Sequence, residues 1–340
     1  MKDEFMQAVV LTGPNAIEVR DVPMPTAAGE AIVRIDQAGI CGTDSKIVKG
    51  VIPARYPLVM GHEMSGEVVE SAPGGEIPAG TRVIIDPAIF CNSCDVCIGD
   101  KRNLCRRGGL LGRDMDGTFC EYVTAGEVYL HVIPDCLDRD TEALLQVLGT
   151  VVHAQRTVSP LPDETAVVIG LGVSGLLQLQ MLAARGVSVI GVTRSAWKRE
   201  LADTFGAAAT CPPDQAEDLV QEMTNGEGAS VVVESVGSEQ TLAQAIELAG
   251  YAGEIVLFGT FSSGSGALPY YQLYLKELTI YNPRAAKSQD YDSAIALSAA
   301  GKVALSPLVT ARYPIQNAAA AVDAVGGDNL KVVLDMGMGN

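Results

Sequence analysis

The chain has 340 residues, of which 48% are hydrophobic and 19% are charged, so it can fill the cores of two ordinary domains and is not extensively disordered. Its formal net charge of −17 disfavours binding to the phosphate backbone of nucleic acids and docking on anionic membranes. The segment from Met1 to Met6 lacks the apolar core of a signal peptide, and we expect a cytoplasmic protein.

Residues 1 to about 150 are predicted to form a small, mostly β domain. Short apolar runs at residues 7–11, 31–35, 66–69 and 82–85 are typical of strands. Gly and Pro residues separate these runs and indicate irregular loops between the strands.

Two short motifs in this region carry residues that can bind a metal ion. The first contains Cys41, Thr43 and Asp44, and in the second His62 is followed directly by Glu63. Cysteine, histidine and a carboxylate form a mixed ligand set that suits catalytic zinc, which keeps one position open for water or substrate. Each motif alone is weak evidence, because a lone cysteine is commonly a small core residue and a His-Glu pair is commonly a polar pair on a loop.

Four closely spaced cysteines give a stronger metal signal. Cys91, Cys94, Cys97 and Cys105 are separated by two, two and seven residues, and the loop between them is short and polar. Four thiolates at this spacing predict a tetrahedral zinc site that is closed and therefore structural. A pair of disulfides or an iron–sulfur cluster is the alternative, and a reducing cytosol favours the metal over disulfides.

From about residue 163 the sequence alternates between strands and helices. Strands are predicted at residues 166–169, 187–192, 231–233 and 255–258, and helices at residues 174–185, 198–205 and 242–249. This alternation predicts a parallel sheet with helices on both faces. Residues 165–184 carry no charge and could span a bilayer by length, but their glycines and glutamines favour a strand, a turn and a buried helix. Beyond residue 284, a helix at residues 293–300 and an extended segment at residues 331–334 are expected to return to the first domain.

A glycine-rich turn joins the first of these strands to its helix. It contains Gly170, Gly172, Val173, Ser174 and Gly175 in the pattern GxGxxG. In this context the glycines allow a tight turn and the close approach of a pyrophosphate, and the helix N-terminus offers free N–H groups to it. An ordinary strand–helix turn is the alternative.

The end of the second strand bears on the choice of cofactor. Where a carboxylate commonly holds the adenosine ribose, the chain has Thr193, Arg194 and Ser195, with Lys198 and Arg199 nearby. Hydroxyl and cationic groups suit a 2′-phosphate, so we predict NADP(H) in preference to NAD(H). The alternative is a basic first helical turn that faces solvent.

With these motifs in this order, the chain resembles the zinc-dependent medium-chain dehydrogenase/reductase family, which includes alcohol, sorbitol and threonine dehydrogenases. The likeness covers nearly the whole chain and includes residues 117–122, 233–237 and 331–334. It implies an α/β protein in which a doubly wound Rossmann sheet is inserted in a mostly β, GroES-like catalytic domain. The implied domains are residues 1–155, with a structural-zinc lobe at about 88–108, residues 156–284, and residues 285–340, which return to the first domain.

The resemblance also assigns roles to individual residues. Cys41 and His62 match the catalytic zinc ligands, and Glu63 matches a ligand or near-ligand. Thr43 matches the hydroxyl that passes the substrate proton, and Asp44 matches the partner that orients the zinc histidine. The implied positions near the nicotinamide half of the cofactor are Thr150, Val236, Phe258 and Gly259.

Two positions depart from the family pattern. Gln146 stands where sorbitol-type members have a glutamate ligand, and Lys46 stands where several members have the outer histidine of the proton relay. The resemblance implies hydride transfer between a nicotinamide cofactor and a secondary alcohol, polyol or sugar, with one catalytic and one structural zinc, in a homodimer or homotetramer. A zinc-free quinone or enone reductase and an inactive cofactor-binding relative remain as alternatives, the latter because of Gln146 and Lys46.

Overall fold

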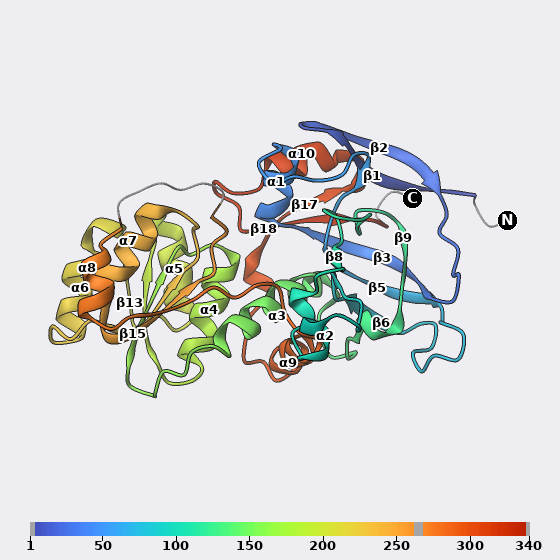
Figure 1. Ribbon diagram of the computed structural model, residues 1–340. Coiled ribbons are helices and arrows are strands. Elements are labelled where there is room, and N and C mark those ends of the chain that lie inside the picture. The colour runs from blue at the N-terminus through green and yellow to red at the C-terminus, as the bar shows by residue number, and fades with distance from the viewer. Residues whose placement is uncertain (1–3, 262–267, 338–340) are drawn as a thin grey trace. The chain divides into compact units, whose positions relative to one another are not determined.

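Two units make up the part of the chain that the computed structural model describes, which is residues 4–261 and 268–337 (Figure 1). The first unit consists of Met1–Gly149, Ala285–Ala300 and Leu305–Asn340. The second unit consists of Thr150–Arg284 and Gly301–Ala304. The first unit is built mainly from β-strands, and the second alternates strands with helices.

Antiparallel pairing dominates the first unit. Its largest sheet has the order β10 (Leu130–Val132), β6 (Arg82–Ile85), β5 (Glu63–Glu70), β3 (Ala31–Ile40), β18 (Lys331–Asp335) and β17 (Val309–Pro314), and β9 (Tyr122–Ala125) also pairs with β3. Two smaller sheets have the orders β2 (Ala16–Pro23), β1 (Phe5–Gly13), β4 (Leu58–Val59) and β7 (Ala88–Ile89), β8 (Gly109–Leu110). The four strands predicted in this region are confirmed and lie within β1, β3, β5 and β6.

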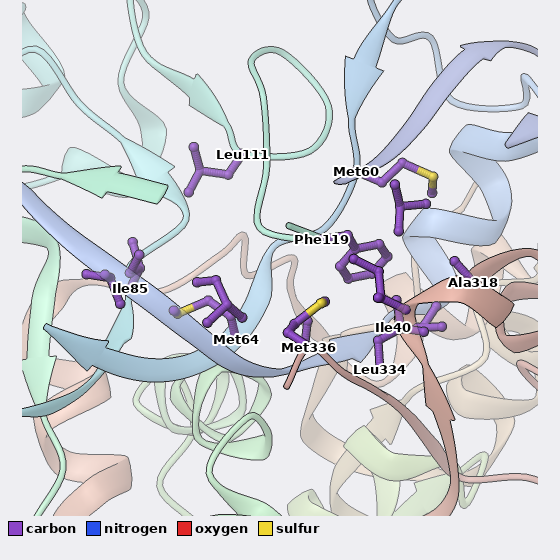
Figure 2. Packing of buried hydrophobic residues seen from close by; sticks show 14 of the residues in the cluster. Ile40, Met60, Met64, Ile85, Leu111, Phe119, Ala318, Leu334 and Met336 are labelled. Carbon is purple, nitrogen blue, oxygen red and sulfur yellow. The ribbon is translucent and has the colours of Figure 1, made fainter. Parts of the chain in front are cut away.

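The C-terminal segment completes the main sheet of the first unit. Strand β18 pairs antiparallel with β3, with Val332 opposite Ile40 and Leu334 opposite Ala38. The tail therefore returns to the β-rich part of the chain. Both strands contribute to one apolar core, in which Phe119 is fully buried with Ile40, Met60 and Leu334 (Figure 2).

Helices are short in the first unit. They are α1 (Gly42–Val48), α2 (Asp95–Ile98), α9 (Ser288–Ala299) and α10 (Ala318–Asp323), while α3 (Leu144–Gln155) runs across the boundary between the units. The helix predicted at residues 293–300 begins earlier, because the Asp290 carboxylate accepts a hydrogen bond from the Lys287 N–H and caps the first turn. Helix α3 was not predicted, although its polar residues Gln146, Thr150 and His153 are spaced four and three apart, as on one face of a helix.

A parallel sheet forms the centre of the second unit. Its order is β13 (Ala209–Cys211), β12 (Ser188–Val192), β11 (Thr165–Ile169), β14 (Ala229–Glu234), β15 (Ala249–Leu257) and β16 (Thr279–Tyr281). The chain leaves β11 toward β12 in one direction and later continues from β14 in the other. Right-handed crossovers then place helices on both faces of the sheet, as a doubly wound fold requires.

The helices of the second unit are α4 (Val173–Ala183), α5 (Ala196–Thr204), α6 (Ala216–Met223), α7 (Glu239–Leu248) and α8 (Tyr270–Leu275). The predicted helices correspond to α4, α5 and α7, with ends displaced by up to three residues. The structure begins α7 earlier because the Ser238 hydroxyl accepts the N–H of Thr241 and caps the helix. Residues 165–184 form β11, the glycine turn and α4, and among the described residues no helix is long and apolar enough to cross a membrane.

Candidate functional site

The four predicted lobe cysteines converge around one point. Their sulfur atoms all lie within 4.8 Å of one another, although Cys91 and Cys105 flank a segment that includes α2. The Sγ atoms of Cys94 and Cys97 are 3.4 Å apart and those of Cys94 and Cys105 are 3.9 Å apart, which excludes a disulfide of about 2.05 Å between them. The tight, four-sulfur arrangement fits a tetrahedral zinc ion.

Hydrogen bonds prepare this lobe for thiolates. The Cys105 sulfur accepts the backbone N–H of Cys91 at 3.3 Å and that of Arg107 at 3.4 Å. Hydrogen bonds from Ser93 lower the pKa of the Cys91 thiol to about 5, whereas burial raises the pKa of the Cys97 thiol to about 12. A bound metal ion would hold all four sulfur atoms in the deprotonated form.

The second predicted ligand set also comes together, from two elements of the first unit. Cys41 lies at the N-terminus of α1, whereas His62 and Glu63 lie at the start of β5, and their ligand atoms are all within 4.8 Å of one another. Gly61 allows the chain to pass close to the Phe119 ring just before His62 and β5. It has a φ of +95°, and a β-carbon there would overlap the Phe119 ring, so only glycine fits between the core and His62.

Asp44 orients both ends of this ligand set. Its carboxylate is fully buried, accepts the Cys41 N–H at 2.8 Å, and lies 3.3 Å from Nδ1 of His62. Burial lowers the pKa of His62, but Asp44 outweighs this effect and raises that pKa well above its usual range. With Nδ1 turned toward Asp44, Nε2 is the nitrogen available to a metal ion.

Lys331 is a buried partner of the site that the sequence did not reveal as functional. Its ammonium group forms an ion pair with Glu63 and donates to the carbonyl of Ile40 at 3.2 Å. Burial lowers its pKa, yet Glu63 and then Cys41 raise it, so the group stays charged. The only sequence signal was a lysine at the start of an apolar strand, in a segment that served to indicate family likeness.

The charges of this cluster fit a divalent cation. With Cys41 as the thiolate and His62 as the neutral imidazole that metal binding requires, Cys41, Asp44 and Glu63 bring three negative charges to the site, and Lys331 brings one positive charge. Uncompensated buried charge is strongly unfavourable, so a dication that brings the balance to zero would stabilise the arrangement. Cys41, His62 and Glu63 would hold such an ion and leave one tetrahedral position open.

Gln146 is buried on α3, beside the hydroxyl of Tyr291. Burial and Asp86 raise the pKa of Tyr291 well above its usual range, while the Gln146 side chain lowers it. The three-residue set does not need Gln146 to complete a catalytic zinc site, and the role of Gln146 as a ligand stays a prediction. Lys46 lies on α1, two residues after Asp44.

In the second unit, the glycine turn has the geometry expected of a dinucleotide-binding fold. Gly170 directly follows β11 with a φ of +92°, and Gly172 is the N-cap of α4, which begins at Val173 and Ser174. A β-carbon on Gly175 would overlap the carbonyl of Gly170. Substitution at either end of the turn would therefore move the helix N-terminus away from the strand.

The end of β12 carries cationic and hydroxyl groups. Arg199 donates to the carbonyl of Thr193 at 2.8 Å and to that of Arg194 at 3.2 Å, so its guanidinium braces this turn. Arg194 itself is exposed, and the Lys198 ammonium lies 5.3 Å from the centre of the Trp197 ring. Ser195 is the N-cap of α5.

The remaining predicted cofactor residues lie in two different settings. Val236, Phe258 and Gly259 directly follow β14 and β15 in the parallel sheet, where Val236 is half exposed. Thr150 is half-buried on α3, at the first position of the second unit. Their roles toward the nicotinamide stay predictions.

Comparison with known proteins decides the family. The alcohol dehydrogenase GroES-like domain matches residues 27–135, and the zinc-binding dehydrogenase domain matches residues 174–300. The chain is 30% identical over 339 residues to the sorbitol dehydrogenase of Halalkalibacterium halodurans, which covers 97% of this chain and 99% of the relative. The chain belongs to the zinc-binding alcohol dehydrogenase family.

Two solved structures extend the likeness to three dimensions. A protein described as a zinc-binding dehydrogenase from Sinorhizobium meliloti 1021, bound to NADP, has a TM-score of 0.91 and 30% identity, over 98% of this chain and 99% of that one. A protein described as a short chain alcohol dehydrogenase from Escherichia coli CFT073, complexed with NADH, has a TM-score of 0.90 and 28% identity, over 98% of this chain and all of that one.

Family membership and geometry together confirm the predicted fold and the general class of activity. This zinc-binding dehydrogenase is an NAD(P)-dependent oxidoreductase with a mixed Cys/His/Glu set and a four-cysteine set for zinc. The zinc-free reductase is disfavoured, because the ligand atoms of Cys41, His62 and Glu63 lie together.

The four-cysteine lobe predicts how much zinc the protein binds. Metal analysis of purified protein should give close to two zinc ions per chain, and Cys94→Ser should retain only one, because a tetrahedral site loses a thiolate. Cys136→Ser is the matched control, since Cys136 is exposed and lies outside both ligand sets, and it should keep both ions. Disulfides found by thiol titration of denatured, unreduced protein would contradict the zinc assignment.

The second prediction concerns Glu63. Glu63→Gln should make one zinc ion labile to a chelator while the lobe ion is retained, because the variant loses a carboxylate ligand and leaves Lys331 as an unpaired buried cation. Glu70→Gln, at an exposed position of the same strand, should release zinc no faster than the original protein. Gln146→Glu should slow release if Gln146 reaches the ion. Identical release from Glu63→Gln and Glu70→Gln would show that Glu63 is not a ligand.

Proposed function

We propose that this protein is a zinc-dependent dehydrogenase that interconverts a secondary alcohol of a polyol or sugar with the corresponding ketone. The observation that carries the proposal is the Cys41–His62–Glu63 set, with a half-buried cysteine and two buried partners, whose three ligands would leave a fourth position open. The polyol class is supported by the end-to-end similarity to a sorbitol dehydrogenase.

The bound groups would supply the reactive chemistry of this site: zinc would act as a Lewis acid toward the substrate oxygen, and a nicotinamide would exchange hydride with the substrate. The chain's own residues organise the reaction. Asp44 fixes the His62 ring and the Cys41 backbone, and Lys331 restrains the Glu63 carboxylate. Thr43, in the first turn of α1 and two residues from Cys41, would pass the alcohol proton outward through its hydroxyl.

The cofactor preference that we propose is NADP(H). From Thr193 to Arg199 the chain has no carboxylate that would repel a 2′-phosphate, and it offers the exposed Arg194 guanidinium. The hydrogen bonds from Arg199 to the carbonyls of Thr193 and Arg194 hold the backbone that carries the hydroxyls of Thr193 and Ser195. The NADP-bound relative agrees with this assignment, whereas the NADH-bound relative shows that the fold also accepts the other cofactor.

Turnover across a panel tests the proposal directly. Sugars, polyols, simple secondary alcohols and their ketones should be assayed with NADP(H) and NAD(H), with polyols or ketoses expected to give the highest kcat/KM. Cys41→Ala should abolish turnover and still bind the dinucleotide. A preference for quinones or enones that survives in Cys41→Ala would indicate the zinc-free reductase, and cofactor binding without any turnover would indicate an inactive relative.

Cofactor selectivity gives a further prediction. Thr193→Asp should weaken NADPH use and improve NADH use, because the new carboxylate repels a 2′-phosphate and accepts hydrogen bonds from a ribose hydroxyl. Thr193→Val removes the hydroxyl without adding charge and should change the NADPH/NADH ratio of kcat/KM far less. If the unaltered enzyme already prefers NADH by tenfold, about 1.4 kcal/mol, the NADP assignment is wrong.

A further inference from the structure

Glu234 is the last residue of β14 and is completely buried. Its Oε1 atom accepts three hydrogen bonds, each of 2.8 Å, from the backbone N–H groups of Val236 and Gly237 and from the Thr241 hydroxyl. The side chain therefore folds back and fixes the loop that follows its own strand. This carboxylate also anchors the first turn of α7, because Thr241 lies in that turn.

The same residue joins this loop to the one after β15. The Glu234 backbone carbonyl accepts the N–H of Phe258 at 2.8 Å and that of Gly259 at 2.9 Å. A β-carbon on Gly259 would lie only 2.7 Å from Oε2 of Glu234, and one on Gly237, whose φ is +85°, would lie 2.7 Å from the carbonyl oxygen of Thr260. The two loops thus interlock with no room for side chains between them.

A third loop, the glycine turn after β11, meets the same assembly. The Ser235 N–H donates to the carbonyl of Ile169 at 2.9 Å, and a β-carbon on Gly170 would lie 2.5 Å from the Val236 side chain. Loops that follow β11, β14 and β15 all lie at the carboxyl ends of the parallel strands. In open α/β sheets this edge is where a dinucleotide binds.

The second carboxylate oxygen of Glu234, Oε2, indicates that this residue does more than stabilise the fold. Oε2 is buried and has no hydrogen-bond partner within residues 4–261 and 268–337. A buried carboxylate with one unpaired oxygen is costly, and an apolar side chain of similar size would pack there more cheaply. The three hydrogen bonds accepted by Oε1 offset part of this cost. They also hold the loop after β14 in one conformation.

We infer that Glu234 is a positioning residue for the nicotinamide half of the cofactor. It locks residues 235–237 and 258–259 in the arrangement that receives this half, and it does not touch the reacting atoms. The inference rests on the proposed cofactor-binding function of the second unit. It predicts that loss of the Oε1 acceptor weakens the binding of the nicotinamide end and spares the adenosine end, which binds at the glycine turn and β12.

Four variants separate the contributions of the Glu234 acceptor, its charge, the Thr241 donor and the helix cap. Glu234→Leu keeps the size of the side chain and removes the acceptor, so the N–H groups of Val236 and Gly237 lose their partner. Glu234→Gln keeps a carbonyl oxygen at Oε1 and removes the charge. Thr241→Val removes one of the three donors. Ser238→Ala is its control, because it removes the hydroxyl that caps the helix and contacts the Thr241 hydroxyl at 2.7 Å, but keeps the Thr241 hydroxyl as a donor to Glu234.

Calorimetric titration of the intact zinc-loaded enzyme provides the readout. The ligands are NADPH and NADH, compared with 2′-phospho-ADP-ribose and ADP-ribose, which lack the nicotinamide. We expect Glu234→Leu to weaken dinucleotide binding at least tenfold and fragment binding less than twofold, with Glu234→Gln close to the original protein. Thr241→Val should lower the ratio of dinucleotide to fragment affinity several-fold, whereas Ser238→Ala should leave that ratio unchanged.

The other outcomes overturn the inference. Equal loss of dinucleotide and fragment affinity would mean that Glu234 only maintains the fold, and unchanged dinucleotide affinity in Glu234→Leu would mean that the loops hold their arrangement without it. If Glu234→Leu does not fold, an unchanged affinity ratio in Thr241→Val refutes the inference. An original protein that binds neither dinucleotide nor fragment would refute the proposed function itself, which is a different result from any change among the variants.

Discussion

The buried ion pair between Lys331 and Glu63 is the interaction on which the catalytic part of the first unit depends. It connects β18 to the candidate metal ligand Glu63 at the start of β5, and the same ammonium donates a hydrogen bond to the Ile40 carbonyl at the end of β3. Three strands of the main sheet therefore meet at one cation. Since a buried carboxylate or ammonium alone is strongly unfavourable, each member of the pair fixes the other.

This pair also determines how strongly the site can activate a ligand. Glu63 shares its charge between Lys331 and any ion held with Cys41 and His62, so it neutralises that ion less than a free carboxylate would. A less neutralised zinc ion is the stronger Lewis acid. The architecture thus balances firm metal retention, which needs anionic ligands, against reactivity, which needs residual positive charge on the ion.

Local sequence patterns predicted the fold class and the candidate metal and cofactor motifs. They did not predict contacts between residues that lie far apart in the sequence. The geometry of four closely spaced cysteines, and of glycines between a strand and a helix, can be predicted from the sequence. The chain between these residues is too short to adopt many other conformations. Lys331 is 268 residues from Glu63, and no spacing rule connects them. Glu234 was noticed only as part of a family-like segment, because its role depends on loops after three separate strands. Only the helices that correspond to α4, α5, α7 and α9 were predicted, and the other helices of the described residues were missed; most of these are no longer than eight residues and show little periodicity.

The position of β18 in the sheet has a consequence for the order of assembly during synthesis. All four lobe cysteines lie within one short segment, so a ribosome-bound chain has every ligand of that set soon after Cys105 emerges. The Cys41–His62–Glu63 set is different, because its counter-charge and its neighbouring strand arrive only with Lys331, 268 residues after Glu63. The lobe can therefore take up zinc early in synthesis, whereas the mixed site acquires its finished electrostatic environment only after the much later Lys331 has been added.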